Sequence, residues 1–291
     1  MIQFTISAEE AGMTIKQYLQ RKHKFSGRLM TRLTRDKNNI RVNNENKLIN
    51  DRLQTNDLLT VKFPKESIGE RLIAEQIPLN IVYEDQHLLV INKAPHIAVL
   101  PSFTDANGTI ANGVLGYYQT KNLPYTVHIV TRLDRNTSGL MIIAKHHYSH
   151  SRLAQMIDKK QIQRKYTAIV QGVLTDHKGT MTYPIGRQSG SIIKRTVTET
   201  GKRAVTNYEV QAIGKNFTVV TIELETGRTH QIRVHFAHLG HPIIGDGLYG
   251  EESEQINRQA LHCHQLNFVH PITKMPMTFQ ANLPSDMGEY S

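Results

Sequence analysis

Two neighbouring segments of alternating apolar and polar residues constrain the possible folds most. Residues 203–213, RAVTNYEVQAI, and residues 217–227, FTVVTIELETG, have the period of a strand, and Gly-Lys-Asn between them is typical of a hairpin. Further strands are predicted at residues 81–83, 88–92, 140–145, 165–172 and 261–266. Because strands are many and helices few, we expect an α+β fold, with helices flanking a mixed, largely antiparallel sheet.

Two segments of this region have the spacing of amphipathic helices instead. Residues 148–160 place their apolar side chains on one side. Residues 229–240 do the same, and Gly240 with Pro242 beyond it marks the end of the predicted helix. Both are expected to cover the sheet.

The first 64 residues read as a separate small α+β domain. Two short helical patterns carry seven Lys and Arg residues, Arg28 and Arg32 among them, and strand-like segments follow up to residue 64. One positive face is expected, although the charges could simply be the solvated side of the helices. Residues 65–78 are polar and end at a proline, so we expect a linker there and a second domain at 79–291.

The overall charge indicates a polyanionic partner. Lys and Arg number 35 against 25 Asp and Glu, a net charge of +10, and nucleic acid is the default partner for such an excess. No apolar run approaches the roughly 20 residues that span a bilayer, so no membrane association is expected. The N-terminus has no secretory pattern, and Cys263 is the one cysteine, which excludes an internal disulfide and leads us to expect a cytoplasmic protein.

The segment VTRLDRNTSGLMIIAK, residues 130–145, places Asp134 between two arginines and just before a buried strand. Loops anchored on rigid strands often hold reactive side chains. An Asp close to Asn-Thr-Ser-Gly is also typical of a turn-forming residue. Both interpretations of Asp134 stay open on spacing alone.

A second segment rich in polar residues covers residues 225–250. A strand breaks at Gly227, and Arg228, His230 and Arg233 lie in the first turns of the predicted helix, where they favour an anion such as a phosphate or a carboxylate. The four histidines of this segment, His230, His235, His238 and His241, do not have the spacing of known zinc motifs, so no metal is expected.

Four segments together resemble one enzyme family. They are RLDRNTSGL, RKYTAIVQG, TGRTHQIRVHFAHLGHPIIGD and QALHCHQLNFVHP, in that order, within residues 81–284. This arrangement is similar to RNA pseudouridine synthases of the RluA/RluD type. Residues 1–64 resemble, more faintly, the small S-four-like RNA-binding module that precedes the catalytic domain in many members.

The resemblance implies a cofactor-free isomerisation in which uracil is detached from its ribose, turned, and rejoined through carbon 5. Asp134 matches the essential aspartate of the family, Tyr166 the active-site tyrosine, and Arg233 the arginine that pairs with the aspartate. Arg132 matches a residue that fills the gap left by the extruded nucleotide. The residues expected to contact the uracil or the RNA are Arg132, Ile232, Arg228, His230, Lys165, Arg28 and Arg32.

This sequence departs from the family pattern in two places. Thr131 stands where a histidine usually precedes Arg-Leu-Asp, and NKAPHIAVLPS replaces the usual Asn-Lys-Pro-Ala-Gly. The expected substrate is ribosomal RNA of the large subunit, with transfer RNA as the alternative, and a monomer is expected. Two other functions compete: an inactive RNA-binding factor for ribosome assembly, and a metal-assisted nuclease or glycosidase.

Overall fold

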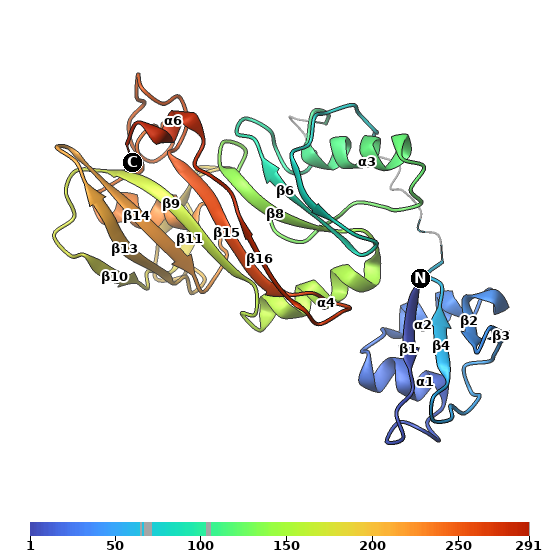
Figure 1. Cartoon of the computed structure of the whole chain (residues 1–291). Helices are drawn as coiled ribbons and strands as arrows, with labels where there is room; N and C mark the ends of the chain where they lie inside the picture. Colours follow the sequence, from blue (N-terminus) through green and yellow to red (C-terminus); the bar gives the residue numbers. More distant parts are fainter. Residues whose placement is uncertain (65, 67–71, 103–105, 291) are drawn as a thin grey trace. The chain divides into compact units, whose positions relative to one another are not determined.

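The computed structural model describes residues 1–64, 66, 72–102 and 106–290 (Figure 1). The chain forms two compact units, Met1–Ser67 and Ile68–Ser291. The linker expected at 65–78 lies partly outside the described residues. In the described part of the chain, no helix is long and apolar enough to cross a membrane.

The small unit is a four-stranded antiparallel sheet with short helices. Its strands, in the order β1-β4-β2-β3, are β1 Ile2–Thr5, β2 Ile40–Val42, β3 Glu45–Asn46 and β4 Leu58–Val61. Its helical segments are α1 Ile15–Gln17, which continues as a π-helical turn over Tyr18–Lys22, α2 Gly27–Leu33, and a 3₁₀ turn at Lys37–Asn39.

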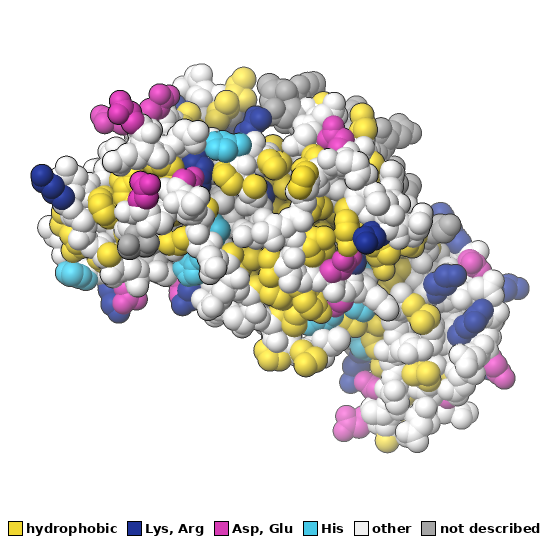
Figure 2. Space-filling model, turned by 45° about the horizontal axis from the view of Figure 1, so that its top comes forward, with side chains coloured by type: hydrophobic (Ala, Val, Ile, Leu, Met, Phe, Trp, Pro, Cys, Tyr) yellow, Lys and Arg dark blue, Asp and Glu magenta, His cyan; other side chains and the backbone are white. Residues whose placement is uncertain are grey.

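Capping side chains decide where the helices of the small unit begin. The Thr14 hydroxyl accepts from the backbone N–H of Gln17 and the Gln17 side chain accepts from the N–H of Thr14, so the first predicted helix begins at Ile15. Ser26 accepts from Leu29 N–H and starts α2. Arg28 and Arg32 lie on α2, and Figure 2 shows Lys and Arg side chains prominent on the visible face of this unit.

The large unit is built on a ten-stranded mixed sheet. Its main strands run in the order β10-β13-β14-β9-β15-β8-β6-β5, with β16 paired to β15 and β7 to β8. The strands are β5 Ile81–Glu84, β6 Leu88–Lys93, β7 His128–Ile129, β8 Ser138–Ala144, β9 Gln163–Gln171, β10 Lys178–Met181, β13 Thr206–Ile213, β14 Phe217–Leu224, β15 Leu261–Val269 and β16 Pro276–Gln280. All pairs are antiparallel except β8 with β15.

The prediction of an α+β fold on a mixed, largely antiparallel sheet is therefore confirmed. A separate hairpin consists of β11 Ile185–Arg187 and β12 Arg195–Val197. The helices of the large unit are α3 Ile110–Thr120, α4 His147–Asp158, α5 Gln231–His238 and α6 Ser285–Gly288. The helix predicted at 229–240 is shorter than expected because His230 has a left-handed backbone, with φ of 56°, so helical geometry begins only at Gln231.

The sheet is buried on both faces where β6 and β8 lie side by side. Along β6, Leu88 and Val90 pack into a core that includes Leu153 of α4, whereas Leu89 and Ile91 pack into a second core with α3. Figure 1 shows α3 beside this end of the sheet. Burial on both faces explains why β6 and β8 read as continuous apolar runs rather than alternating strands.

The turn between β5 and β6 is held by one carboxylate. Asp85 Oδ1 accepts from the backbone N–H groups of His87, at 2.7 Å, and Leu88, at 2.8 Å. Asp85 Oδ2 lies 2.8 Å from His270 Nε2 and accepts from the Tyr83 hydroxyl. Burial raises the pKa of Asp85, but the hydrogen bonds of His270, His87 and Leu88 outweigh it and hold the pKa well below its ordinary value.

We expect Asp85→Asn to destabilise the protein at pH 7 by of the order of 2 to 3 kcal/mol. Since the pKa of Asp85 is lower in the folded than in the unfolded state, its stabilisation is full above about pH 4 and is lost as pH falls further. The difference in unfolding free energy between wild type and variant, from urea denaturation, should therefore shrink below about pH 4. Asp158→Asn, at an exposed aspartate, is the control; an unchanged difference at low pH would contradict this account.

Candidate active site

Asp134 lies in the loop between β7 and β8, directly before the central strand of the large unit. Thr137 N–H donates to the Asp134 carbonyl oxygen at 3.1 Å and closes a turn. The Asp134 side chain is 27% exposed, so its carboxylate is partly accessible. The Asp is therefore both the first residue of a turn and a carboxylate directed into the site.

Hydrogen bonds from buried polar side chains fix this turn. Lys93 Nζ donates to the carbonyl oxygen of Arg135 at 2.9 Å, and Gln259 Nε2 donates to Thr137 Oγ1 at 3.1 Å. Arg258 donates to the carbonyl oxygen of Asn136 at 3.3 Å. Arg258 is itself fully buried, and two hydrogen bonds of 2.7 and 2.8 Å pair it with Asp286. The position of Asp134 is thus fixed by three long-range contacts.

Arg233 of α5 connects two carboxylates. Its Nε and Nη2 donate to Asp246, both at 2.7 Å, and its Nη1 donates to Asp134 Oδ2 at 3.2 Å. Burial lowers the pKa of Arg233, but the hydrogen bonds and charge of Asp246 and Asp134 raise it above its ordinary value. Asp246 orients the guanidinium, and the remaining nitrogen meets Asp134 across 99 residues of sequence.

His230 lies beside the same carboxylate. Its Nε2 is 3.9 Å from Asp134 Oδ2, which is too long for a hydrogen bond, and its Nδ1 is 2.8 Å from the Tyr249 hydroxyl. Burial lowers the pKa of His230, the Asp134 charge acts in the opposite direction, and the Arg233 charge lowers the pKa again, with a net decrease. The imidazole is therefore neutral at neutral pH.

A row of paired residues across the sheet places Tyr166 near Asp134. Tyr166 of β9 pairs with Cys263 of β15, Cys263 with Gly139 of β8, and Gly139 with Lys93 of β6. A side chain at Gly139 would begin 2.3 Å from the Cys263 carbonyl oxygen, and Gly139 has φ of 116°, so this close parallel pairing requires glycine. The row aligns Tyr166 with the turn that carries Asp134.

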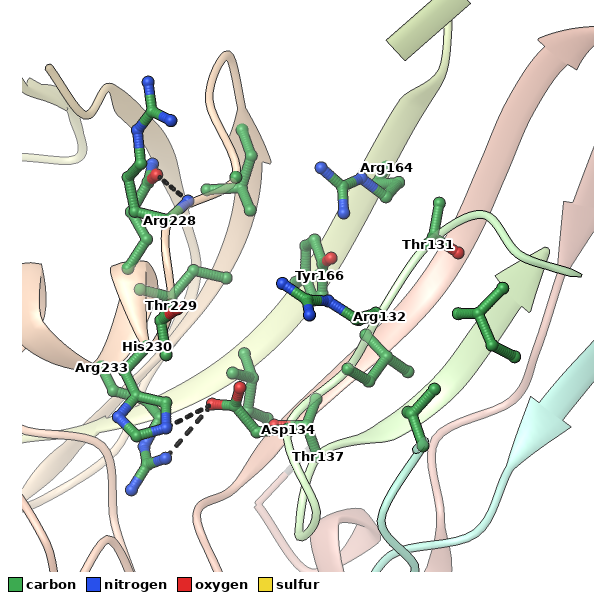
Figure 3. A pocket seen from close by; sticks show the side chains of 18 of the residues that line it. Thr131, Arg132, Asp134, Thr137, Arg164, Tyr166, Arg228, Thr229, His230 and Arg233 are labelled. Atoms are coloured by element: carbon green, nitrogen blue, oxygen red, sulfur yellow. Dashed lines mark hydrogen bonds and ion pairs between the residues drawn. The ribbon is translucent and has the colours of Figure 1, made fainter. Parts of the chain in front are cut away.

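These groups line a cavity of about 760 Å³. Its lining includes Asp134, Tyr166, Arg233, His230 and Ile232, and Figure 3 shows Asp134 directed toward His230 and Arg233, with Tyr166 on β9. The volume is typical of sites for small organic groups. The cavity combines one accessible carboxylate, one buried guanidinium and apolar walls.

The remaining predicted RNA-contacting residues divide into two sets. Arg132 and Arg228 are exposed and line the cavity, so they lie at its mouth. Lys165 does not line it, because side chains alternate along β9: Lys165 points to the other face and pairs with Glu223 at 2.7 Å. Arg28 and Arg32 belong to the small unit and are not part of this cavity.

The family model for RNA pseudouridylate synthase matches residues 87–238 of this chain. The chain is also 47% identical over 277 residues to the Bacillus subtilis protein named uncharacterized RNA pseudouridine synthase YjbO, covering 95% of this chain and 98% of that protein. The chain belongs to the RNA pseudouridine synthase family. The synthase is accordingly an isomerase that acts on RNA.

Other relatives place the synthase near the RluD type. It is 38% identical over 267 residues to the ribosomal large subunit pseudouridine synthase D of Haemophilus influenzae, which covers 82% of both chains. The structure of human RNA pseudouridylate synthase domain containing 1 matches with a TM-score of 0.59 at 23% identity, over 75% of this chain and 86% of that chain, and so shares the fold. The resemblance of residues 81–284 to pseudouridine synthases of the RluA/RluD type is confirmed.

Thr131, where the resemblance leads us to expect a histidine, has a structural contact in this synthase. It is buried, its hydroxyl accepts from the backbone N–H of Ile142 at 2.9 Å, and it lines the cavity. The substitution therefore leaves the carboxylate and the guanidinium of the site in place.

The four histidines of residues 225–250 do not converge within the described residues. The ring nitrogens of His235 lie 2.9 Å from Thr206 Oγ1 and 2.9 Å from the Tyr183 carbonyl oxygen, and His241 Nδ1 lies 2.8 Å from the Gln171 carbonyl oxygen. These rings support the fold, and only His230 lines the cavity.

Three important residues of the site were missed from the sequence. Arg164 lines the cavity two positions before Tyr166, and strict alternation along β9 could have indicated it in place of Lys165. Lys93 is visible in the sequence only as part of the Asn-Lys-Ala-Pro variant. Asp246, within GDGLYG, gives no sequence signal that it pairs with Arg233, since that contact arises from the fold.

We expect Lys93→Met to destabilise the synthase by about 1 to 3 kcal/mol, because it leaves buried carbonyl oxygens without a donor. Lys93 Nζ donates to the carbonyls of Ala94, at 2.8 Å, Ile97, at 3.0 Å, and Arg135, at 2.9 Å. Burial lowers the pKa of Lys93 to about 7, although the Asp134 charge opposes this.

Urea denaturation of Lys93→Met measures this loss, with Lys215→Met at an exposed hairpin position as the matched control. Folded Lys93→Met should also have a lower turnover, because it lacks the contact to Arg135 that helps to fix the turn with Asp134. Equal stability of the two variants would show that Lys93 does not support the turn.

Proposed function

We propose that this synthase converts specific uridines of large-subunit ribosomal RNA to pseudouridine, with Asp134 acting at the ribose carbon. The observation that carries the proposal is the contact of Asp134 with Arg233 at 3.2 Å inside a cavity of about 760 Å³. A guanidinium is permanently charged and presents several donors in a fixed geometry, so Arg233 can hold and orient the Asp134 carboxylate.

In this proposal, the Asp134 carboxylate acts on the ribose carbon of the glycosidic bond. As the bond from ribose carbon 1 to uracil nitrogen 1 breaks, the carbon gains positive character, which a carboxylate stabilises or captures covalently. The base then turns, and a bond forms between the same ribose carbon and uracil carbon 5. Arg233, held by Asp246, keeps the carboxylate in place during both steps.

Tyr166 and Ile232 flank the uracil ring in this proposal. Both are buried cavity residues, and flat or apolar contacts fix the plane of a ring while still allowing it to turn. Burial raises the pKa of Tyr166 far above its ordinary value, so its hydroxyl stays protonated at neutral pH. Tyr166 therefore serves as a neutral wall and hydrogen-bond donor rather than as a base.

The reaction also needs a proton acceptor. After rejoining, carbon 5 must release its proton while nitrogen 1 gains one, so that product and substrate have the same formula. The Nδ1 of the neutral His230 ring lies 2.8 Å from the Tyr249 hydroxyl, and its Nε2 lies 3.9 Å from Asp134 Oδ2. We propose the tautomer in which Nδ1–H donates to Tyr249, so that Nε2 carries the free lone pair. We assign the removal of this proton to His230.

We expect His230→Gln to lower turnover by about 10²- to 10⁴-fold, the usual contribution of a general base. Release of tritium from RNA labelled at uracil carbon 5 measures the step directly. His238→Gln, on the exposed side of the same helix, is the control. Wild-type tritium release by His230→Gln would assign the proton to another group.

The choice of RNA rests on relatives and charge. Ribosomal large subunit pseudouridine synthases D are among the relatives, and the protein has a net charge of +10. We propose that residues 1–64 form an S-four-like RNA-binding domain, with Arg28 and Arg32 contacting phosphates, and that 65–78 link it to a catalytic domain at 79–291. Arg132 at the cavity mouth fills the space of the extruded uridine, whose unstacking costs a few kcal/mol. We further propose a cytoplasmic monomer.

Mapping of pseudouridines in total RNA tests the proposal. In a strain that lacks the gene, one or more pseudouridines of large-subunit ribosomal RNA should disappear. They should return with the wild-type gene and not with Asp134→Asn. Loss confined to transfer RNA would overturn the choice of substrate, and an unchanged map would overturn the proposed activity.

A further inference from the structure

Three histidines gather on the large unit away from the cavity. They are His128 of β7 and His147 and His150 of α4, and one ring nitrogen from each lies within 4.8 Å of the others. All three are half-buried. The ring centres of His128 and His150 are 5.5 Å apart, and those of His128 and His147 are 6.0 Å apart. None of them lines the cavity that holds Asp134.

The fold, rather than the sequence, creates this arrangement. His147 and His150 are three positions apart on α4, so they share one face of the helix. β7 lies beside the start of α4 and brings the third imidazole to that face. The neighbouring His146 takes no part, because its ring caps α4 by accepting from Ser149 N–H and lies 3.0 Å from His87.

We propose that His128, His147 and His150 bind a divalent transition-metal ion, Zn²⁺ in particular. Neutral imidazole suits zinc, whereas Mg²⁺ and Ca²⁺ prefer oxygen ligands, which this triad does not offer. Nitrogens on one tetrahedral zinc lie about 3.4 Å apart, so small side-chain rotations close the present distances. Three protein ligands leave the fourth position to water.

One contact already orients a ligand ring. Thr126 Oγ1 lies 2.8 Å from His128 Nε2. Such hydrogen bonds fix the tautomer and orientation of metal-binding histidines. The positive end of the α4 dipole acts against a cation, so the affinity has to come from the three coordinate bonds.

The metal would connect a short strand to a helix. β7 pairs two residues with β8, and the chain continues through Val130 and Thr131, whose N–H groups donate to the carbonyl oxygen of Ile142, to Asp134. A bond from His128 to α4 through the ion would anchor the strand from which the Asp134 loop departs. The inference concerns a binding site and does not depend on the proposed reaction.

Cobalt and zinc titrations of the full-length protein, stripped with a chelator and prepared without a polyhistidine tag, test the site. We expect wild type to bind one more equivalent of Co²⁺ than His150→Ala does, with visible absorption bands of tetrahedral Co²⁺ that Zn²⁺ abolishes. Zn²⁺ should also raise the melting temperature of wild type and not of His150→Ala. His177→Ala, at an exposed histidine, should behave as wild type.

Two further variants guard against a folding defect. His147→Gln should lose the same bands, and Thr126→Val, which keeps the side-chain shape, should weaken Co²⁺ binding by about 10- to 100-fold. Identical stoichiometry and spectra for wild type and His150→Ala would overturn the proposal. So would octahedral spectra alone, because these indicate only loosely held ions.

Discussion

Asp134→Asn should lower pseudouridine formation by about 10⁴-fold or more, the scale seen when the reacting group of an enzyme is removed. The variant has nearly the same shape, and it retains an oxygen that can accept from Arg233. It lacks the negative charge that stabilises the ribose carbon as its base departs. The loss should therefore appear in the chemical step rather than in RNA binding.

Single-turnover assays on a transcript of the target RNA, with Kd measured separately, distinguish these two effects. Asp176→Asn, at an exposed aspartate outside the cavity, is the matched control. Asp134→Glu extends the side chain by one carbon and should lose about 10²-fold, the cost of a displacement of about 1 Å. Activity of Asp134→Asn above about one hundredth of wild type would exclude an essential carboxylate.

The spacing of apolar residues predicted much of the fold, because the residues that are buried in a strand or helix are mostly apolar. The strands β13 and β14 alternate since one side of each faces the core, and β8 is apolar from Leu140 to Ala144 since both of its faces are buried. Helix α3 and strand β1 were not predicted. In α3 nearly every residue is buried, glycines included, so its sequence lacks the polar face that marks an amphipathic helix.

The site could be predicted only as far as family resemblance and local spacing reach. The motifs shared with the family predict Asp134, Tyr166 and Arg233 as site residues, and the structure brings them to one cavity. The pairing of Arg233 with Asp246 depends on how the segment after α5 returns to the sheet. Gly245 makes that return possible: its φ is 73°, and a side chain there would begin 2.2 Å from the carbonyl oxygen of Arg258.

Asp246→Asn should have the second-largest effect, although Asp246 does not line the cavity. Its carboxylate is 1% exposed and holds Arg233 with two bonds of 2.7 Å. An Asn presents an N–H₂ group to one of the guanidinium nitrogens, so one bond is lost and the buried charge is left less compensated. Removing one partner of a buried ion pair costs about 3 to 5 kcal/mol in unfolding free energy.

The same change should also reduce turnover by about 10²-fold or more, because Arg233 is no longer fixed between its two carboxylates. Asp246 acts through Arg233, so kcat should fall while KM changes little. Glu209→Gln provides the control, since it breaks an exposed pair with Lys178 that is worth no more than about 1 kcal/mol.

Urea denaturation and steady-state kinetics on the two variants separate stability from positioning. If Asp246→Asn lost stability but kept wild-type kcat below its unfolding transition, Asp246 would be a purely structural partner. If kcat fell in proportion to the unfolded fraction, the same conclusion would hold. A fall in kcat of the fully folded variant, with the melting temperature of Glu209→Gln unchanged, is the result that makes Arg233 orientation a requirement for the action of Asp134.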